Sequence, residues 1–391
     1  MLSARAQNCG TLPPTPAEYD LARHVISNLD ISALRNAGTT CVPLQAHVVR
    51  LNDGTGGITQ TQLNIGLSFL NNFYLDAGIE FFWKGAPDFA NNTDYYTYDE
   101  TGTDLDTETG LVALFTTAND AVNIYYMNAM TVASAGAVCG YAYFPNNTAQ
   151  ANRILMVNSC TYSAPNGTLC HEMGHYFSLF HTHEGTENGN ANANAENVPR
   201  TGGQANCSTK GDLICDTQAD PRYNAAQFNG ATCTYTGAAT DINGVPYTPP
   251  VDNVMSYYPD DCGGLFTAGQ YTRITQGLAT RLTHNAYTLT ASPASVTAPS
   301  GLAVSLVGAS LQLTWTDNAA NDLGYLIERS TTSASAAYTS NSANAAARRN
   351  NSLAWAATWL QISLKSCCSI SKRRSSAFST SDSYSFKSGV M

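Results

Sequence analysis

Residues 171–181 read HEMGHYFSLFH, and they hold the side chains of this chain that are best suited to chemistry. Four of the seven histidines fall within thirteen residues, at His171, His175, His181 and His183. Residues four apart lie on one face of an α-helix, so His171 and His175 can bind the same metal ion. Glu172 is rotated by about 100° from His171, which places it beside that ion without binding it. The pattern predicts a metal site with an acid that can take a proton from water.

A third ligand requires a change in the path of the chain. His181 comes ten residues after His171, and on a continuous helix it would point about 80° away from the ligand face. The chain must therefore leave the helix near Ser178, where the signature H-E-x-x-H-x-x-G-x-x-H has glycine. A left-handed turn at a non-glycine residue costs roughly 1–2 kcal/mol, and zinc coordination of on the order of 10 kcal/mol offsets that cost. Three histidines would leave one open position on a tetrahedral zinc ion.

Other interpretations of this segment stay open. The third ligand could be an acid, Glu184 or Glu187, and the pattern could also arise by chance among polar surface residues. The apolar residues around the motif favour a buried helix and therefore the metal site. We expect His183 to be a bystander, and we expect structural roles for the remaining histidines, His24, His47 and His284.

An alternation of strands and helices must position this helix. The hydrophobic pattern predicts a helix over residues 59–75, with Gly78 just past its end. Strands are expected at 42–51, 79–83, 122–127, 139–144 and 154–157. Pro145 closes the fourth of these strands, which suits the edge of a sheet. The metal-binding helix starts near Thr168, a mobile surface loop covers 184–210, and a closing helix covers 270–285.

Composition restricts the kind of protein. Of 391 residues, 43% are hydrophobic and only 12% are charged, with a formal net charge of −10. No apolar run is long enough to cross a membrane. The acidic body suits solubility, with calcium binding and attraction of basic substrates as the functional alternative. Ala4-Arg5-Ala6 is similar to the end of a secretory signal, so we expect residues 1–6 to be a remnant of one and the protein to be secreted.

The cysteines indicate an oxidising compartment. There are eleven of them and no C-x-x-C pair. One loop-rich stretch holds a group that we expect to form disulfides, in any of three pairings: Cys207, Cys215, Cys233 and Cys262.

Together these motifs resemble the pappalysin family of the metzincin metallopeptidases, over about residues 9–273. A second signature, Asn253-Val254-Met255-Ser256-Tyr257, is similar to the Met-turn of that family. The resemblance implies that Met255 forms a hydrophobic floor below the zinc ion and that Tyr257 stabilises the reaction intermediate. It also implies an α+β fold over residues 36–290. This fold has a five-stranded mixed twisted sheet, a backing helix, the zinc helix and an irregular C-terminal subdomain.

Substrate recognition also follows from the resemblance. Gly140, Tyr141 and Ala142 match an edge strand to which an extended peptide can add by backbone hydrogen bonds. Asp260 matches an acid at the base of the pocket for the residue after the cleaved bond. It implies a preference for Arg or Lys there, although Asp260 could instead be a turn residue.

Cys9 matches a cysteine that binds the zinc ion of a latent enzyme, with a disulfide partner as the alternative. Residues 7–35 would then be a pro-segment, and the bond between Arg35 and Asn36 is our candidate for its removal.

Two further features are implied by the resemblance. Asp212, Thr217 and Asp220 match a calcium-binding segment, although Gln218 and Ala219 depart from its pattern and solvated loop acids would look similar. The family has two crossed disulfides in this half, which favours Cys207 with Cys233 and Cys215 with Cys262.

The C-terminal part has a different pattern. Residues 298–340 resemble the start of a fibronectin type III module, with Trp315 and Tyr325 as core aromatics, and imply a partial β-sandwich. Residues 341–391 contain seven Lys or Arg and one acid in unpatterned sequence. There we expect a disordered basic tail and no nucleic-acid partner.

The resulting prediction is a secreted, zymogen-type zinc endopeptidase, monomeric, that acts on proteins or peptides and holds structural calcium. The alternative is an inactive adhesion or binding protein on the same scaffold.

Overall fold

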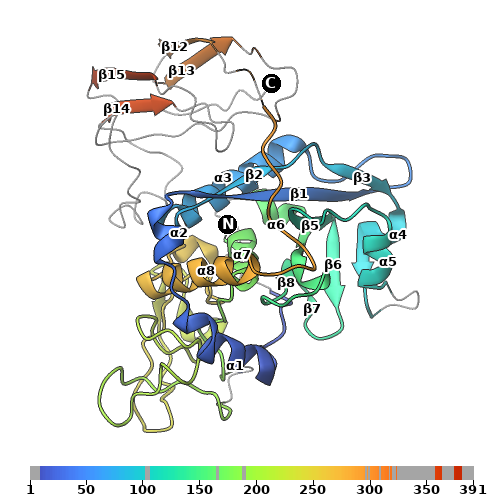
Figure 1. The fold of residues 1–391 in the computed structure, drawn as a ribbon. Coiled ribbons are helices and arrows are strands. Elements are labelled where there is room, and N and C mark those ends of the chain that lie inside the picture. Colours follow the sequence, from blue (N-terminus) through green and yellow to red (C-terminus); the bar gives the residue numbers. More distant parts are fainter. Residues whose placement is uncertain are drawn as a thin grey trace.

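The computed structural model describes a mixed α+β protein (Figure 1). It describes residues 9–101, 106–163, 167–186, 191–295, 297, 300–307, 310–316, 318, 323, 357–362 and 374–380. In that part of the chain, no helix has the length and apolarity needed to cross a membrane.

The main sheet runs in the order β2-β1-β5-β9-β8, and β3 also pairs with β1. Its strands are β1 (Thr40–Arg50), β2 (Ile79–Trp83), β3 (Asp88–Asn91), β5 (Val122–Met127), β8 (Gly140–Ala142) and β9 (Arg153–Val157). All pairings are parallel except that of β8 with β9. Among the strands of the described residues, β9 is the one partner of β8, so β8 is the edge strand that the sequence predicts.

The sheet has six strands, and the expected number of five is wrong. The reason is the length of β1, which has eleven residues against five in β2. Strand β2 pairs with the first half of β1, and β3 pairs with residues His47 to Arg50 beyond it. The short β3 is mostly exposed and carries no alternating pattern that would reveal it.

Helix α3 (Gln60–Tyr74) backs the sheet, as predicted. Thr59 and Gln62 form a capping box at its start, which satisfies two backbone N–H groups. The Tyr74 hydroxyl donates to the carbonyl of Cys170 at 2.8 Å, so α3 is tied to helix α7 (Thr168–Tyr176). The largest hydrophobic cluster lies between the sheet and these two helices. Helix α8 (Ala268–Arg281) closes the domain.

Shorter elements complete the described fold. They are α1 (Pro16–His24), η1 (Ile26–Asn28), α2 (Ser32–Asn36), η2 (Leu75–Ala77), α4 (Thr93–Tyr96), β4 (Thr97–Asp99), α5 (Glu108–Ala113), β6 (Ala129–Val132), β7 (Gly136–Ala137), η3 (Gln150–Asn152), α6 (Ser159–Tyr162), η5 (Ala225–Gln227), β10 (Phe228–Asn229), β11 (Thr234–Tyr235) and η6 (Asp260–Cys262). Most of the segment between α7 and α8 is irregular, as expected.

Helix α1 lies in the segment that we expected to be a simple leader. Thr15 and Glu18 form a capping box, and Pro16 is the first helical residue, a position that proline favours. Both features are local, so the sequence itself carries the signal for this helix.

Two hairpins are described towards the C-terminus. Strand β12 (Ser300–Val307) pairs with β13 (Ser310–Thr316), near the predicted positions. Strand β14 (Ala357–Ile362) pairs with β15 (Arg374–Thr380) inside the stretch expected to be disordered. Tyr325 and the rest of 341–391 lie outside the described residues.

The disulfides correct the pairing that the resemblance favoured. Cys207 bonds to Cys215, and Cys233 bonds to Cys262. The reason for the first pair is local: Gly211 and Leu213 both adopt positive φ, and the resulting tight turn brings the Cα atoms of Cys207 and Cys215 to 5.0 Å. A further bond, between Cys139 and Cys160, was not predicted and joins the start of β8 to α6.

Candidate metal centre

Three histidines converge as the sequence predicts. The Nε2 atom of His175 lies 3.1 Å from the Nε2 of His171 and 3.1 Å from that of His181. With the Cys9 sulfur they form a group of four buried donor atoms that all lie within 4.8 Å of one another. A set of three imidazoles and one sulfur, packed this closely, fits a tetrahedral zinc ion.

The helix ends where the third histidine requires it. Ser178 has φ of 74°, in the left-handed region. The N–H of Ser178 donates to the carbonyl of His175, and the N–H of Leu179 donates to that of Gly174. These two bonds are a Schellman motif, the usual end of a helix at a left-handed residue. The predicted turn at Ser178 is therefore confirmed, and it returns His181 to the other two histidines.

Backbone carbonyls set the orientation of two imidazoles. His171 Nδ1 lies 2.7 Å from the carbonyl oxygen of Val254, and His175 Nδ1 lies 2.7 Å from that of Leu179. A carbonyl can only accept, so each Nδ1 carries the proton and each Nε2 keeps its lone pair for a metal. Burial holds the pKa of both histidines well below the ordinary value, so both rings are neutral.

Met255 packs against helix α7. It is fully buried, and a Cβ atom on Gly174 of α7 would lie only 2.5 Å from its sulfur. Its carbonyl accepts from the N–H of Thr182, beside His181, at 3.1 Å. The segment 253–257 therefore packs against α7 through Met255 and orients His171 through the carbonyl of Val254.

Glu172 points into the same space without joining the donor group. Its Oε2 accepts from the Thr11 hydroxyl at 3.0 Å and lies 3.5 Å from the Cys9 sulfur. Its Oε1 is buried and has no hydrogen-bond partner among the described residues. Burial raises the pKa of Glu172 to about 8, which is a property expected of a carboxylate that exchanges protons near neutral pH.

The N-terminal segment lies on the edge strand. Cys9 pairs with Gly140 in a parallel bridge, and the N–H of Gly10 donates to the Gly140 carbonyl at 2.8 Å. The Thr11 hydroxyl accepts from the N–H of Ala142 at 2.9 Å. Burial and the charge of Glu172 raise the pKa of Cys9 well above its ordinary value, so this thiol stays protonated unless a cation binds beside it.

Tyr257 borders the group on another side. Its hydroxyl donates to the carbonyl of Cys9 at 3.3 Å, and its ring centroid lies 4.8 Å from that of His181. The guanidinium of Arg222 lies over the Tyr257 ring at 5.2 Å. Arg222 was not singled out from the sequence, because nothing in its local sequence indicates this contact.

His183 and the acidic alternatives can also be located. His183 is buried and stacks on His181, with centroids 4.7 Å apart. The donor group contains His181 and not Glu184; Glu187 lies outside the described residues.

Asp260 lies at the start of α7. Its Oδ2 accepts from the N–H of Gly167, the N-cap of that helix, at 3.0 Å. A carboxylate there also complements the positive end of the helix dipole. This bond supports the alternative that Asp260 is a turn residue. The bond uses Oδ2 of the carboxylate, and Asp260 stays partly exposed.

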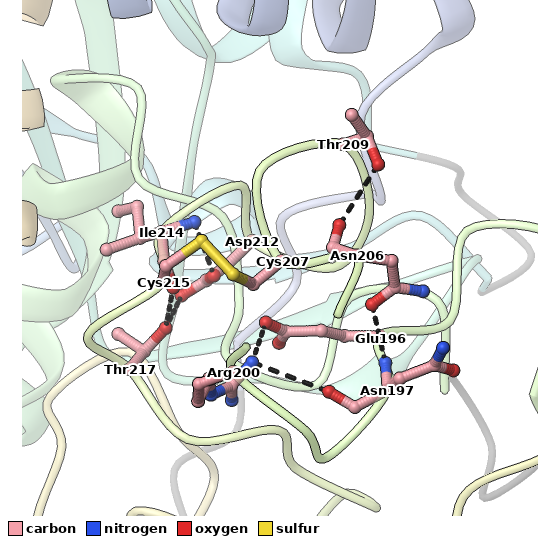
Figure 2. The surroundings of a disulfide bond; sticks show 10 residues. All are labelled: Glu196, Asn197, Arg200, Asn206, Cys207, Thr209, Asp212, Ile214, Cys215 and Thr217. Carbon is pink, nitrogen blue, oxygen red and sulfur yellow. Dashed lines mark hydrogen bonds and ion pairs between the residues drawn. A yellow bond between two sulfur atoms is a disulfide. The ribbon is translucent and has the colours of Figure 1, made fainter. Parts of the chain in front are cut away.

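The expected calcium residues are only partly together. The Asp212 carboxylate accepts from the Thr217 hydroxyl at 2.8 Å, whereas Asp220 accepts from the hydroxyl of Thr182 at 2.6 Å and not from this pair. Figure 2 shows that Asp212 lies near Glu196 and Arg200 around the disulfide of Cys207.

Glu196 was not predicted from the sequence, where it sits in a polar loop. It is only 3% exposed, and the supposed surface loop also buries Glu184. Burial first, and Asp212 second, raise the pKa of Glu196, so several carboxylates compete for little positive charge in this region.

Part of this chain is similar to known peptidases. Residues 114–279 match the peptidase family model described as pregnancy-associated plasma protein-A. An extracellular metalloprotease of Sordaria macrospora is 26% identical over 287 residues, covering 68% of this chain and 86% of the relative. One of Podospora anserina is 27% identical over 247 residues, covering 60% and 71%. Both matches fit the predicted family.

Among solved structures, a chain from "Structure of a chaperone-substrate complex" matches with a TM-score of 0.29 and 14% identity. The match covers 63% of this chain and 35% of that one, so this chain spans about a third of its length. A similarity this small supports no conclusion about the fold.

The family match spans α7, His181 and the Met255 segment, and so it includes all three histidines of the donor group. The relatives are named extracellular metalloproteases. The match to this chain covers most of the length of each of them. The chain is therefore a zinc metalloendopeptidase, and its residues 114–279 are similar to peptidases of the pappalysin family.

Proposed function

We propose that this protein is a secreted endopeptidase, made in a latent form, in which His171, His175 and His181 bind the catalytic zinc ion. The convergence of these three Nε2 atoms with the Cys9 sulfur is the observation that carries the proposal. The extracellular relatives support secretion.

The residues around the ion have distinct tasks in this proposal. Zinc held there supplies Lewis acidity, which acidifies water and polarises the carbonyl of the peptide bond. Glu172 takes the proton from the attacking water as the new C–O bond forms. It then passes that proton to the amide nitrogen as the C–N bond breaks. Tyr257 donates a hydrogen bond to the carbonyl oxygen, on which negative charge develops.

Latency follows from what covers these groups. The thiol of Cys9 lies against His175, with its sulfur 3.6 Å from Nε2, and Thr11 binds the carboxylate of Glu172. Zinc would favour the thiolate of Cys9, which then fills the open position. Removing residues 7–35 frees both the metal and the base. Arg35 is in α2 and donates to the Thr272 hydroxyl at 2.9 Å, so cleavage after it requires the end of α2 to open.

Peptides would bind to the strand that the latent segment now covers. β8 offers the backbone groups of Gly140 and Ala142, which bond to Gly10 and Thr11. We propose that an extended substrate replaces them by strand addition. We further propose Asp260 as the acid that selects Arg or Lys after the cleaved bond, because its carboxylate stays partly exposed near the start of α7.

We also propose calcium at Asp212 and Thr217, with Glu196 as an added ligand. The buried Oε2 of Glu196 has no hydrogen-bond partner among the described residues. Burial raises the pKa of both carboxylates, and Asp212 raises that of Glu196 further, an environment that suits a hard divalent cation. Asp220 is left as a link between loops, since Thr182 and the N–H of Arg222 already bind its carboxylate. The test is calcium titration of the Glu196→Gln variant and of the parent protein. The parent should bind calcium more tightly than the variant.

The decisive experiment compares Glu172→Gln with Glu80→Gln, which lies on β2 at the opposite edge of the sheet. Both proteins are activated by cleavage within the pro-segment, and zinc content and hydrolysis of an unfolded protein are measured. Glu172→Gln should keep one zinc per chain and lose at least about a hundredfold in rate, while Glu80→Gln matches the parent. Undiminished hydrolysis by Glu172→Gln refutes the mechanism, and absence of hydrolysis by the parent favours the inactive binding protein.

Latency has a separate test in the full chain. Cys9→Ala should hydrolyse peptides without processing, because no thiol competes for the metal. A Cys9→Ala protein as silent as the unprocessed parent would exclude this cysteine as the switch.

A further inference from the structure

An apolar surface beside the metal centre is covered by helix α1. We define the aromatic patch as Phe144, Phe180 and Leu213, which form one buried cluster with Tyr19 and Ala22 of α1. The Tyr19 ring stacks on Phe180 with centroids 5.5 Å apart and an interplanar angle of 15°. All three patch residues are less than a tenth exposed while α1 is in place. Loss of α1 therefore uncovers this patch.

The aromatic patch is continuous with the metal centre. Phe144 contacts the ring of His175 edge to face, with centroids 5.5 Å apart, and the ring of Phe180 at 5.0 Å. Phe180 directly precedes His181 in the sequence. A side chain that sits on the patch is therefore close to the bond that would be cleaved.

The patch is also in line with the edge strand. The latent segment starts at the metal group with Cys9, bonds to Gly140 and Ala142, and then turns so that Tyr19 reaches the patch. Phe144 lies four residues beyond Gly140 and two beyond the end of β8, so at most about 13 Å of chain separates it from Gly140. A peptide lying on β8 and centred on the metal would reach the patch three to four residues from its cleaved bond.

We infer that the aromatic patch of the activated enzyme is a subsite for an aromatic side chain of the substrate, three to four residues from the cleaved bond. The inference rests on the proposed function, because the patch opens only when α1 leaves. Tyr19 shows the chemistry that fits: a flat ring stacks on Phe180 and Phe144 closes one side. Aromatic pairs in such arrangements are favourable beyond the area that they bury.

The subsite also distinguishes tyrosine from phenylalanine. The Tyr19 hydroxyl donates to the carbonyl of Gly211 at 3.0 Å. A substrate tyrosine in the same position can make that hydrogen bond, whereas phenylalanine leaves the carbonyl without it. We expect Tyr to be preferred over Phe by about threefold, as for one neutral hydrogen bond, and Phe over Ala by about ten- to a hundredfold.

The experiment uses the full chain activated by cleavage before β1. Peptides identical except for Tyr, Phe, Ala or Asp at the third or fourth position on each side of the cleaved bond are compared by kcat/KM. At one of these positions the order should be Tyr, Phe, Ala and Asp. Leu213→Ala should reduce the Tyr to Ala ratio at that position, because the patch loses one of its three members. Leu282→Ala, at an exposed position on the C-terminal end of α8, should leave the ratio unchanged.

The outcomes separate this inference from the proposed function. If the parent cuts all peptides and the ratios stay within about twofold at every position, the subsite is refuted and the peptidase stands. If the activated parent cuts no peptide, the proposed function fails and the subsite fails with it. If Leu213→Ala does not fold, the kcat/KM ratios of the parent for the Tyr, Phe, Ala and Asp peptides decide the inference.

Discussion

Replacing Ser178 with glycine should stabilise the protein. Ser178 is held at φ of 74°, and an L-residue with a side chain pays about 1–2 kcal/mol there. Glycine avoids that cost but loses about 0.5–1 kcal/mol through its greater freedom in the unfolded chain. The free energy of unfolding should therefore rise by about 0.5–1 kcal/mol, which raises Tm by about 1–4 °C for a domain of this size.

The assay is thermal unfolding of the latent chain with zinc present, alongside zinc affinity measured by competition with a chelator. Ser178→Ala is the matched control, because alanine also loses the hydroxyl but keeps the conformational cost. Zinc affinity should not fall in Ser178→Gly, since glycine preserves the turn that returns His181 to the site. The reasoning is refuted if Ser178→Gly lowers Tm, or if Ser178→Ala raises it as much as glycine does.

Three further predictions follow from the structure. Gly277→Ala should lower Tm by several degrees, because the new Cβ atom would lie 2.1 Å from the carbonyl oxygen of Phe177, a backbone atom that cannot move aside. Gly203→Ala is the control, since Gly203 has open space around it, and its Tm should match that of the parent. Burial raises the pKa values of Asp212 and Glu196, so the calcium-free fold retains protons and its stability falls as pH rises from about 4. The rise in Tm on adding calcium should therefore be larger at pH 8 than at pH 5, and an equal rise would contradict calcium binding there. Zinc chelation should abolish hydrolysis by the activated enzyme and lower its Tm, with both restored by zinc but not by magnesium.

The sequence predicts the centre of the fold well, because periodic patterns and strict spacing are local properties. The bounds of β2 and β5 are as expected. Helix geometry requires a turn before His181, and the glycine position of the H-E-x-x-H-x-x-G-x-x-H signature places that turn at Ser178. The histidine group could be derived in the same way. Three imidazoles within eleven residues can reach one metal ion by few possible paths of the chain.

Features that depend on tertiary contacts could not be derived. Nothing in the local sequence shows that Glu196 is buried, because its neighbours are those of a polar loop. The pairing of Cys207 with Cys215 depends on a tight turn through Leu213, a residue that rarely adopts positive φ. The resemblance to a family pattern therefore suggested a different pairing.

Arg281, the last residue of α8, is completely buried and joins three parts of the catalytic domain. Its guanidinium donates to three carbonyls: that of Tyr176 at the end of α7, that of Ala151 shortly before β9, and that of Tyr143 just after β8. The family match stops at residue 279. A catalytic fragment cut at that boundary would lack the cation on which these carbonyls converge. Fragments prepared for structural or enzymatic work should therefore extend past Arg281, and through Tyr287, whose hydroxyl accepts from the same guanidinium.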